Sequence, residues 1–242
     1  MPDAIFADPR LAPLYDTFDG DRDDLAPYLA IAGELGARTV ADIGCGTGAL
    51  AILLAAHGHT VTAVDPAEAS VDIARTKDPG GAVTWIHGDA SDLPAARADL
   101  AAMTGNVAQV FVTDELWSGT LTAIRAALRP GGWLVFEARR PGRRAWEDWA
   151  AARDPLVLDV PGVGRVARRL EVTDVSLPLV SFRFTYRFPD GSEVVSDSTL
   201  RFRDRDELDH GLTAHGFRTV DVRDAPDRPG MEFVFLARRD DG

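Results

Sequence analysis

The sequence predicts a doubly wound α/β fold, in which helices cover both faces of a mostly parallel sheet. Along residues 37–138, short apolar runs alternate with longer segments of helical period. A glycine-rich turn at residues 44–48 breaks the first of these runs just before a helix begins. The chain of 242 residues is long enough for one domain of this kind with an insertion.

A lead-in helix is expected before the first strand. Residues 6–24 show no strong period, but from Leu25 onward apolar residues recur on one helical face as far as Gly36. The residues of this face are Leu25, Tyr28, Leu29, Ala32 and Leu35.

The glycine-rich turn follows a short buried strand that begins at Thr39. Gly44, Gly46 and Gly48 stand at alternate positions, and an apolar helix begins at Ala49. A turn this sharp needs backbone angles that a Cβ disfavours, and bare backbone lets a ligand approach the N–H groups at the start of a helix. The turn is therefore expected to hold a polar ligand.

A carboxylate is expected beside this turn. The helix over 49–57 leads to a second strand, 60–64, which ends in Asp65. In a parallel βαβ unit the tip of the second strand lies next to the glycine turn, where a carboxylate can accept both hydroxyl hydrogens of a ribose. The site is thus expected to bind a nucleoside, and Gly44 to Ala49 also satisfies the loose G-x-G-x-x-A pattern of dinucleotide-binding proteins.

Asp42 favours a cationic ligand over a pyrophosphate, because a carboxylate repels phosphate and attracts an amino group. The segment Asp-Ile-Gly-Cys-Gly-Thr-Gly closely resembles the first motif of the class I S-adenosylmethionine-dependent methyltransferases, acidic-x-Gly-x-Gly-x-Gly. In that family the turn holds the amino-acid part of S-adenosylmethionine, and the acidic residue after the second strand holds its ribose. The resemblance implies a Rossmann-like, mostly parallel seven-stranded sheet with a closing antiparallel hairpin.

A second motif of the same family follows the third strand. A helix over 67–77 and a strand over 82–87 lead to Gly-Asp-Ala-Ser-Asp-Leu-Pro. The resemblance assigns the Asp89 side chain to the adenine amino group and the backbone N–H of Ala90 to the adenine ring. Taken alone, Asp89 or Asp92 would more simply cap the following helix.

The N-terminal segment, 1–36, is expected to contribute Tyr15 to the site. Similar members of the family often fold such a segment over the cofactor, and the alternative is a solvated linker that an aromatic side chain anchors. The cofactor-binding residues that the resemblance implies are Tyr15, Asp42, Gly44, Cys45, Gly46, Gly48, Asp65, Pro66, Asp89, Ala90 and Thr104.

Strand four, 99–103, is followed by the segment that faces the sulfonium methyl group in this family. Asn106 and Gln109 stand where a polar side chain would contact the substrate. Thr113 begins the next helix in a capping pattern. That helix runs to Arg129-Pro-Gly-Gly, and strand five over 133–138 completes a phrase that is frequent in the family.

Residues 139–203 depart from the family pattern. Trp146 and Trp149 share one face of a short helix, and apolar residues alternate strictly with polar ones from Val180 to Phe188. Asp190-Gly191 then indicates a hairpin turn. We expect an antiparallel β insertion after strand five that acts as a substrate cap, a dimer surface or only a packed extension.

One domain therefore accounts for the whole chain. It comprises the N-terminal segment, a cofactor-binding core over 37–138, the inserted cap over 139–203, and a C-terminal helix and hairpin over 204–242. The candidate substrate-pocket residues are Asn106, Gln109, Arg139 and Trp146.

Composition narrows the choice of partners. The net charge is −12, and Lys77 is the only lysine among 26 basic residues, which disfavours nucleic acid and anionic membranes. Cys45 is the only cysteine, so no intrachain disulfide forms and a reducing cytoplasm is compatible. No apolar run is long enough to span a membrane, the histidines have no metal-ligand spacing, and no metal is expected. We expect a cytoplasmic protein.

The expected function is S-adenosylmethionine-dependent methyl transfer to an O, N or C atom of a small-molecule substrate, by direct displacement. A base is needed only if the accepting atom is protonated, and no residue is identified as that base. Two alternatives stay open: an NAD-dependent oxidoreductase, and a protein that binds S-adenosylmethionine without transferring its methyl group. A homodimer is a further expectation.

Overall fold

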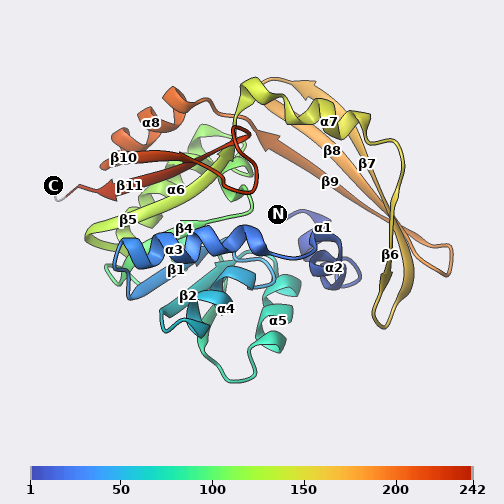
Figure 1. The fold of residues 1–242 in the computed structure, drawn as a ribbon, viewed down its shortest axis with the longest axis horizontal. Coiled ribbons are helices and arrows are strands. Elements are labelled where there is room, and N and C mark those ends of the chain that lie inside the picture. Colours follow the sequence, from blue (N-terminus) through green and yellow to red (C-terminus); the bar gives the residue numbers. More distant parts are fainter. Residues whose placement is uncertain (1, 241–242) are drawn as a thin grey trace.

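The computed structural model describes residues 2–240 and confirms the expected α/β class (Figure 1). The main sheet has seven strands in the order β10-β11-β5-β4-β1-β2-β3. Its strands are β1 (Thr39–Ile43), β2 (Thr60–Asp65), β3 (Val83–His87), β4 (Ala98–Met103), β5 (Leu128–Arg139), β10 (Phe217–Asp224) and β11 (Glu232–Arg239). Strands β1 to β5 are parallel, whereas β11 is antiparallel to both β5 and β10. The closing antiparallel hairpin is therefore confirmed.

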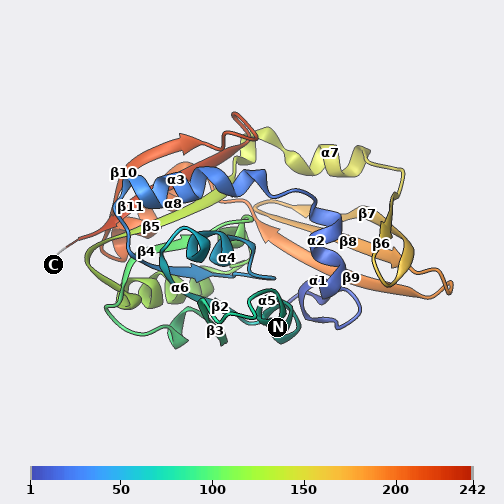
Figure 2. The ribbon, with the colours of Figure 1, turned by 60° about the horizontal axis from the view of Figure 1, so that its bottom comes forward.

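Helices cover both faces of the main sheet (Figures 1 and 2). On one face, Ile31 of α3 and Leu54 of α4 belong to a single apolar cluster with strand residues. On the other, Leu121 of α6 and Leu212 of α8 belong to a second cluster. The helices of the core are α3 (Ala26–Glu34), α4 (Ala49–Ala56), α5 (Glu68–Lys77), α6 (Asp114–Ala127) and α8 (Arg205–Ala214).

The glycine turn has the geometry that its sequence predicts. Gly44, Gly46 and Gly48 have φ angles of 69°, 53° and 86°, a region that side chains with a Cβ rarely adopt. A Cβ on Gly44 would lie 2.6 Å from Val107, and one on Gly48 would lie 2.5 Å from Trp85. The turn is therefore pressed against the segment that follows β4.

Strand five begins earlier than expected. The sequence predicts a strand over 133–138, but β5 starts at Leu128, and α6 ends at Ala127. Leu128 pairs with Ala98 of β4, and the pairing register then shifts before Trp133. Proline and glycine are tolerated in a strand at such an irregularity, which is why the Pro-Gly-Gly segment did not mark the strand boundary.

The insertion forms a separate four-stranded sheet, and its strands are antiparallel, as the sequence predicts. The strand order is β6-β7-β8-β9. Along β8, Val180 and Tyr186 are fully buried and Arg183 and Arg187 are exposed, so the predicted alternation is confirmed. The bounds are α7 (Ala145–Ala151), β6 (Leu156–Val160), β7 (Gly164–Ser176), β8 (Leu179–Arg187) and β9 (Glu193–Arg201).

The first two helices of the N-terminal segment lie between the two sheets (Figures 1 and 2). They are α1 (Ala4–Ala7) and α2 (Tyr15–Asp19), which are too short to give a period in the sequence. The backbone N–H of Ile5 donates to Ser196 of β9, and Ser70 of α5 donates to the carbonyl of Phe6. The segment thus bridges the core and the insertion, and a solvated linker is wrong for it, since Leu11 and Leu14 are 0% exposed.

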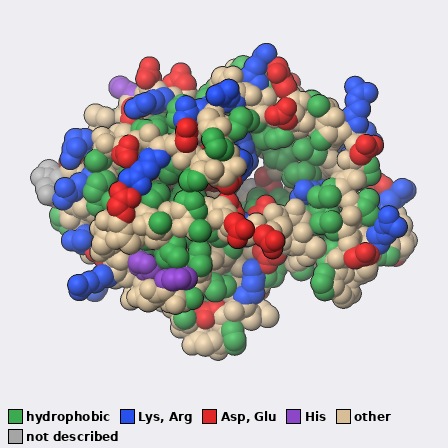
Figure 3. Space-filling view, viewed as in Figure 1, with side chains coloured by type: hydrophobic (Ala, Val, Ile, Leu, Met, Phe, Trp, Pro, Cys, Tyr) green, Lys and Arg blue, Asp and Glu red, His purple; other side chains and the backbone are tan. Residues whose placement is uncertain are grey.

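Short 3-10 turns complete the described chain, at Ala12–Leu14, Asp23–Leu25, Ala90–Asp92, Val107–Gln109 and Pro141–Arg143. No helix within residues 2–240 is long and apolar enough to cross a membrane. Figure 3 shows the surface hollowed between the main body and the inserted sheet, with apolar side chains on its wall.

Candidate functional site

Asp65 links the glycine turn to the end of β2 and to the start of α5 through hydrogen bonds. Its Oδ2 accepts the backbone N–H of Gly46 at 2.8 Å, and its Oδ1 accepts that of Ala67 at 2.8 Å. Burial raises the pKa of the Asp65 carboxyl, while these backbone hydrogen bonds act in the opposite direction. Each carboxylate oxygen has a second lone pair, so Asp65 can still accept hydroxyl hydrogens from a ligand.

Asp42 is buried below the turn with an unpartnered oxygen. Its side chain is 1% exposed, and its Oδ2 has no hydrogen-bond donor among the described residues. Burial, and secondly the nearby charge of Asp65, raise the Asp42 pKa to about 7. A buried acceptor without a donor is costly, so the site favours a ligand that brings an N–H group and a positive charge.

Cys45 does not have the environment of a reactive thiol. Burial, followed by the charges of Asp42 and Asp65, raises the pKa of its thiol. Because the thiolate is the nucleophilic form, Cys45 is not expected to act as a nucleophile near neutral pH. The sequence predicts that Cys45 lies in the turn without acting as a nucleophile, and this environment agrees with that prediction.

Asp16 of α2 connects the N-terminal segment to the turn. Its Oδ1 accepts the hydroxyl of the buried Thr47 at 2.5 Å, and its Oδ2 lies 2.6 Å from Nζ of Lys77. Tyr15 is next to it, with its ring 5.3 Å from that of Phe6, and burial raises its pKa to about 12. The segment therefore closes over the glycine turn, and contact between Tyr15 and a cofactor stays a prediction.

Asp89 and Asp92 form the helix cap that was the simpler interpretation of their motif. Asp89 accepts hydrogen bonds from the backbone N–H and the hydroxyl of Ser91, and Asp92 accepts the N–H of Asp89. Asp89 is exposed and Ala90 is buried. The N–H of Gly88 donates to the carbonyl of Asp65, so this loop lies beside the site, and the adenine roles of Asp89 and Ala90 stay predictions.

Pro66 and Thr104 occupy the ends of neighbouring strands. Pro66 directly follows β2, and its carbonyl lies 3.2 Å from Nε2 of His87. Thr104 directly follows β4, which pairs with β1. Both therefore lie at the carboxyl edge of the sheet, where α/β sheets bind their ligands.

The four candidate substrate residues separate into two groups. The Oε1 of Gln109 accepts from Nη1 of Arg139 at 3.1 Å, and Asn106 lies on the same short turn as Gln109. Trp146, by contrast, is 4% exposed and packs edge-on against Phe202 at 4.8 Å between centroids. Trp146 therefore has a packing role between α7 and the inserted sheet, and its contact with substrate stays a prediction.

Two buried glutamates, Glu137 and Glu232, lie beside Asn106 and Arg139, and neither was predicted from the sequence. Glu137 at the end of β5 accepts the backbone N–H of Asn106 at 2.9 Å and the hydroxyl of Tyr28. Burial, and secondly the charge of Glu232, raise the Glu137 pKa to about 7. A glutamate directly before the apolar run Phe-Val-Phe-Leu of β11, or directly after the apolar run Trp-Leu-Val-Phe of β5, was a signal that could have identified them.

The residues at the turn fit S-adenosylmethionine. Asp42 offers a buried acceptor to the amino group, and Asp65 has free lone pairs for the ribose hydroxyls. The space in which a Cβ of Gly46 would stand is free of other atoms within 4 Å, so a ligand can lie against its backbone. A pyrophosphate would meet these two carboxylates instead, which disfavours a dinucleotide.

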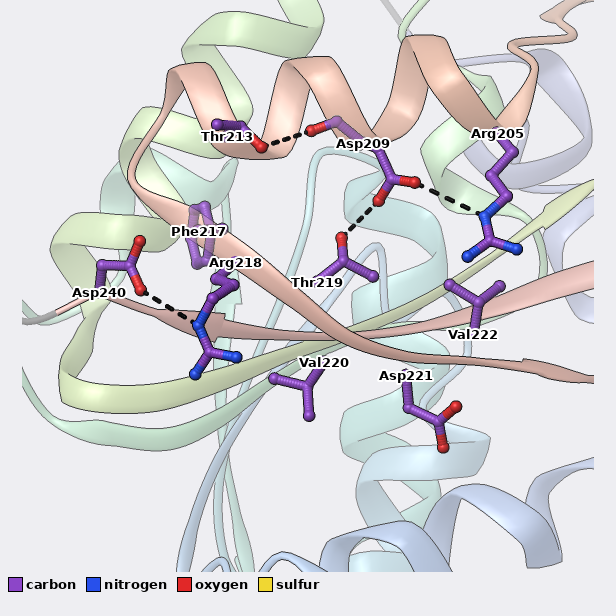
Figure 4. A pocket seen from close by; sticks show the side chains of 10 residues that line it. All are labelled: Arg205, Asp209, Thr213, Phe217, Arg218, Thr219, Val220, Asp221, Val222 and Asp240. Atoms are coloured by element: carbon purple, nitrogen blue, oxygen red, sulfur yellow. Dashed lines mark hydrogen bonds and ion pairs between the residues drawn. The ribbon is translucent and has the colours of Figure 1, made fainter.

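A second hollow, of about 640 Å³, lies far from this edge, between α8 and β10 (Figure 4). Its polar groups already satisfy each other: Thr219 donates to Asp209 at 2.6 Å, and Arg218 lies 3.9 Å from Asp240. The described residues include no cluster of three or more histidine, cysteine, aspartate or glutamate side chains suited to a metal ion. The carboxyl edge remains the candidate site.

Comparison with known proteins agrees with this geometry. Residues 40–132 match the family model "Methyltransferase domain". The chain is 33% identical over 138 residues to the cypemycin N-terminal methyltransferase of a Streptomyces species, covering 56% of each chain. The chain thus spans about half the length of the curated relatives it matches.

Solved structures share the fold over almost the entire chain. The methyltransferase CcbJ of Streptomyces caelestis has a TM-score of 0.77 and 22% identity, covering 95% of this chain and 96% of its own. CalS10, an amino pentose methyltransferase of Micromonospora echinaspora solved with S-adenosylmethionine bound, has a TM-score of 0.69 and 23% identity, with 90% of each chain covered. The matched family model, the acidic and glycine motif and the order of the strands thus show a methyltransferase domain over residues 40–132, similar to those of S-adenosylmethionine-dependent methyltransferases.

Proposed function

We propose that this protein transfers the methyl group of S-adenosylmethionine to a small-molecule acceptor. The observation that carries the proposal is the unpartnered, buried Asp42 oxygen beside Asp65 and a bare glycine turn. S-adenosylmethionine supplies an electrophilic methyl group on a positively charged sulfur. The residues of the chain hold the cofactor, align the accepting atom with the methyl carbon and exclude water, and this alignment provides much of the rate.

The acceptor is proposed to enter beneath the inserted sheet. The N-terminal segment and the insertion pack against each other through a shared apolar cluster, which supports a joint role as a cap over the carboxyl edge. The names of two similar proteins point to different acceptors, the N-terminus of cypemycin and an amino pentose. We propose a monomer or homodimer acting in the cytoplasm, without a nucleic-acid partner in view of the acidic net charge of −12.

Binding and turnover together test the proposed function. Calorimetry should show binding of S-adenosylmethionine and no binding of NADH. Incubation with S-adenosylmethionine and small-molecule extracts should then release S-adenosylhomocysteine, detected by mass spectrometry. Binding of NADH in place of S-adenosylmethionine would favour the oxidoreductase alternative, whereas binding without release in any extract would favour the alternative that lacks methyl transfer.

Gln109→Ala should lower turnover while cofactor affinity stays within a few fold. Gln109 is 1% exposed, and its side-chain hydrogen bonds within residues 2–240 are to Arg139 and the carbonyl of Arg201 rather than to the glycine turn or Asp65. Trp146→Ala should instead lower the free energy of unfolding by about 3 to 5 kcal/mol, because it leaves a cavity beside Phe202. Steady-state kinetics and urea titration separate the two effects, and a Gln109→Ala enzyme with unchanged turnover would remove this residue from the acceptor pocket.

A further inference from the structure

A buried polar cluster joins the ends of β4 and β5 to the start of β11. Glu232 is directly opposite Arg139 in the antiparallel register, and Asn106 follows β4. Asn106, Glu137 and Glu232 are 3%, 3% and 1% exposed. Val107, the neighbour of Asn106, is the residue that presses on Gly44, so the cluster lies next to the proposed cofactor turn.

Hydrogen bonds fix the orientation of the Asn106 amide. Its Nδ2 lies 3.1 Å from Oε1 of Glu232 and 3.4 Å from Oε1 of Glu137. The reversed amide would direct its carbonyl oxygen at two carboxylates, which is unfavourable. Oδ1 of Asn106 is therefore an acceptor, and it has no donor among the described residues.

Glu232 has a second unpartnered acceptor. Both arginines that face it approach Oε1: Nη1 of Arg228 lies at 3.0 Å, and Nε of Arg139 lies at 3.8 Å. Oε2 of Glu232 is buried and has no hydrogen-bond partner within residues 2–240. Two buried acceptors on residues that are hydrogen-bonded to each other thus lack donors, a costly arrangement in a protein interior.

The chemistry of this pair selects a class of acceptor molecule. A hydroxyl has one hydrogen and can satisfy only one of the two oxygens, and a carboxylate or phosphate has none to donate. A primary or secondary amine has several N–H groups in its protonated form, and its positive charge is attracted by the Glu232 carboxylate. Building on the proposed methyl transfer, we propose that Glu232 and Asn106 bind the amino group of an amine substrate, so that the protein is an N-methyltransferase.

The proposed step is balanced in protons and electrons. A protonated amine has no lone pair, so one N–H proton first passes to the carboxylate of Glu232. The nitrogen pair then forms the new N–C bond, and the electron pair of the broken C–S bond stays on sulfur. The product leaves as a methylated ammonium ion, and Glu232 then releases the proton to solvent, which restores its carboxylate. Arg139 is 22% exposed, so it is the member of this cluster that solvent contacts.

Matched probes test the choice of amine. Calorimetry with the full chain compares benzylamine with benzyl alcohol, which has the same shape but a hydroxyl group, with and without S-adenosylhomocysteine. Benzylamine should bind at least about tenfold more tightly than the alcohol, since a charge-assisted hydrogen bond is lost with the alcohol. Glu232→Gln should reduce benzylamine affinity by about tenfold or more, because it keeps the shape of the side chain and removes its charge.

Two further variants guard against a folding artefact. Asn106→Gly suits the φ of 62° at this position and removes the amide, so it should also weaken benzylamine binding. Glu34→Gln changes a glutamate that pairs with Arg223 at the surface and should leave the affinity unchanged. Benzylamine binding that is absent, no tighter than that of the alcohol, or unaffected by both site variants would overturn the amine assignment. If the unmodified protein did not bind S-adenosylmethionine, the proposed function itself would be overturned.

Discussion

Asp65→Ala is expected to weaken S-adenosylmethionine binding by well over tenfold. The carboxylate is 7% exposed and holds the backbone N–H groups of Gly46 and Ala67. If Asp65 holds the ribose as proposed, its loss removes two charge-assisted hydrogen bonds to the ribose, each worth roughly 1.5 to 3 kcal/mol. It also leaves the Gly46 N–H of the turn without its acceptor. Calorimetric titration of the variant with S-adenosylmethionine measures the loss.

Gly46→Val should cause a similar loss of affinity for a different reason. A Cβ at Gly46 meets no atom of the described residues within 4 Å, so the valine side chain points into the space proposed for the ligand. The φ of 53° costs such a residue about 1 to 2 kcal/mol, which a domain of this size tolerates. Gly48→Val makes a useful contrast, because its side chain meets Trp85 at 2.5 Å and should destabilise the fold itself.

Gly33→Val provides the matched control for these variants. Gly33 lies in α3, and nothing stands within 4 Å of its Cβ position. Circular dichroism and thermal melting establish that Asp65→Ala and Gly46→Val are folded. If both folded variants kept the affinity of the unmodified protein, the assignment of the cofactor to this turn would be wrong.

The parallel core was predictable because its signals are local. Each strand from β1 to β4 is a short apolar run that a glycine, proline or acidic turn ends, so its boundaries in the structure agree to within a residue or so. The proposed cofactor-binding residues of this part follow directly from those turns. The boundary of β5 was missed because its pairing with β4 at Leu128, a tertiary contact, overrides the Pro-Gly-Gly signal.

The residues around the proposed acceptor pocket were less predictable because they come from segments that are far apart in the sequence. Glu232 and Asn106 are hydrogen-bonded although 126 positions separate them, and no local pattern gives that register. The helices α1 and α2 are too short for a period and are buried against an inserted sheet whose place the sequence does not specify. Trp146 was proposed for the pocket from its position near the family motif, whereas contacts with Phe202 place it in an apolar cluster.

Asp42→Asn is expected to stabilise the protein without cofactor at pH 8 while weakening cofactor binding. The carboxyl is 1% exposed, and burial, followed by the charge of Asp65, raises its pKa from 3.8 to about 7. The folded state therefore binds more protons than the unfolded chain between about pH 4 and pH 7. The contribution of Asp42 to the free energy of unfolding is most favourable below about pH 4 and is lost as the pH rises to about 7.

The size of the effect follows from the two pKa values. Their difference corresponds to on the order of 4 kcal/mol of unfavourable free energy once Asp42 is ionised above pH 7. Asparagine has nearly the same shape and no ionisation, so the variant should exceed the unmodified protein in stability by more at pH 8 than at pH 5. Urea titrations at both values of pH measure the difference, which should be about 2 to 3 kcal/mol.

The same substitution separates stability from function. Glu137 also has a pKa raised to about 7, so the unmodified protein has a second group with the same sign, and only the difference between the two proteins isolates Asp42. Asp21→Asn, at an exposed position of the N-terminal segment, should leave both pH dependence and affinity unchanged. Because the amino group of the cofactor is attracted by ionised Asp42, affinity for S-adenosylmethionine in the unmodified protein should rise from pH 5 to pH 8, and this rise should shrink in Asp42→Asn. The contrary result would be an Asp42→Asn variant whose free energy of unfolding differs from that of the unmodified protein by the same amount at pH 5 and pH 8. If this variant also bound the cofactor normally, Asp42 would be neither strained nor a ligand.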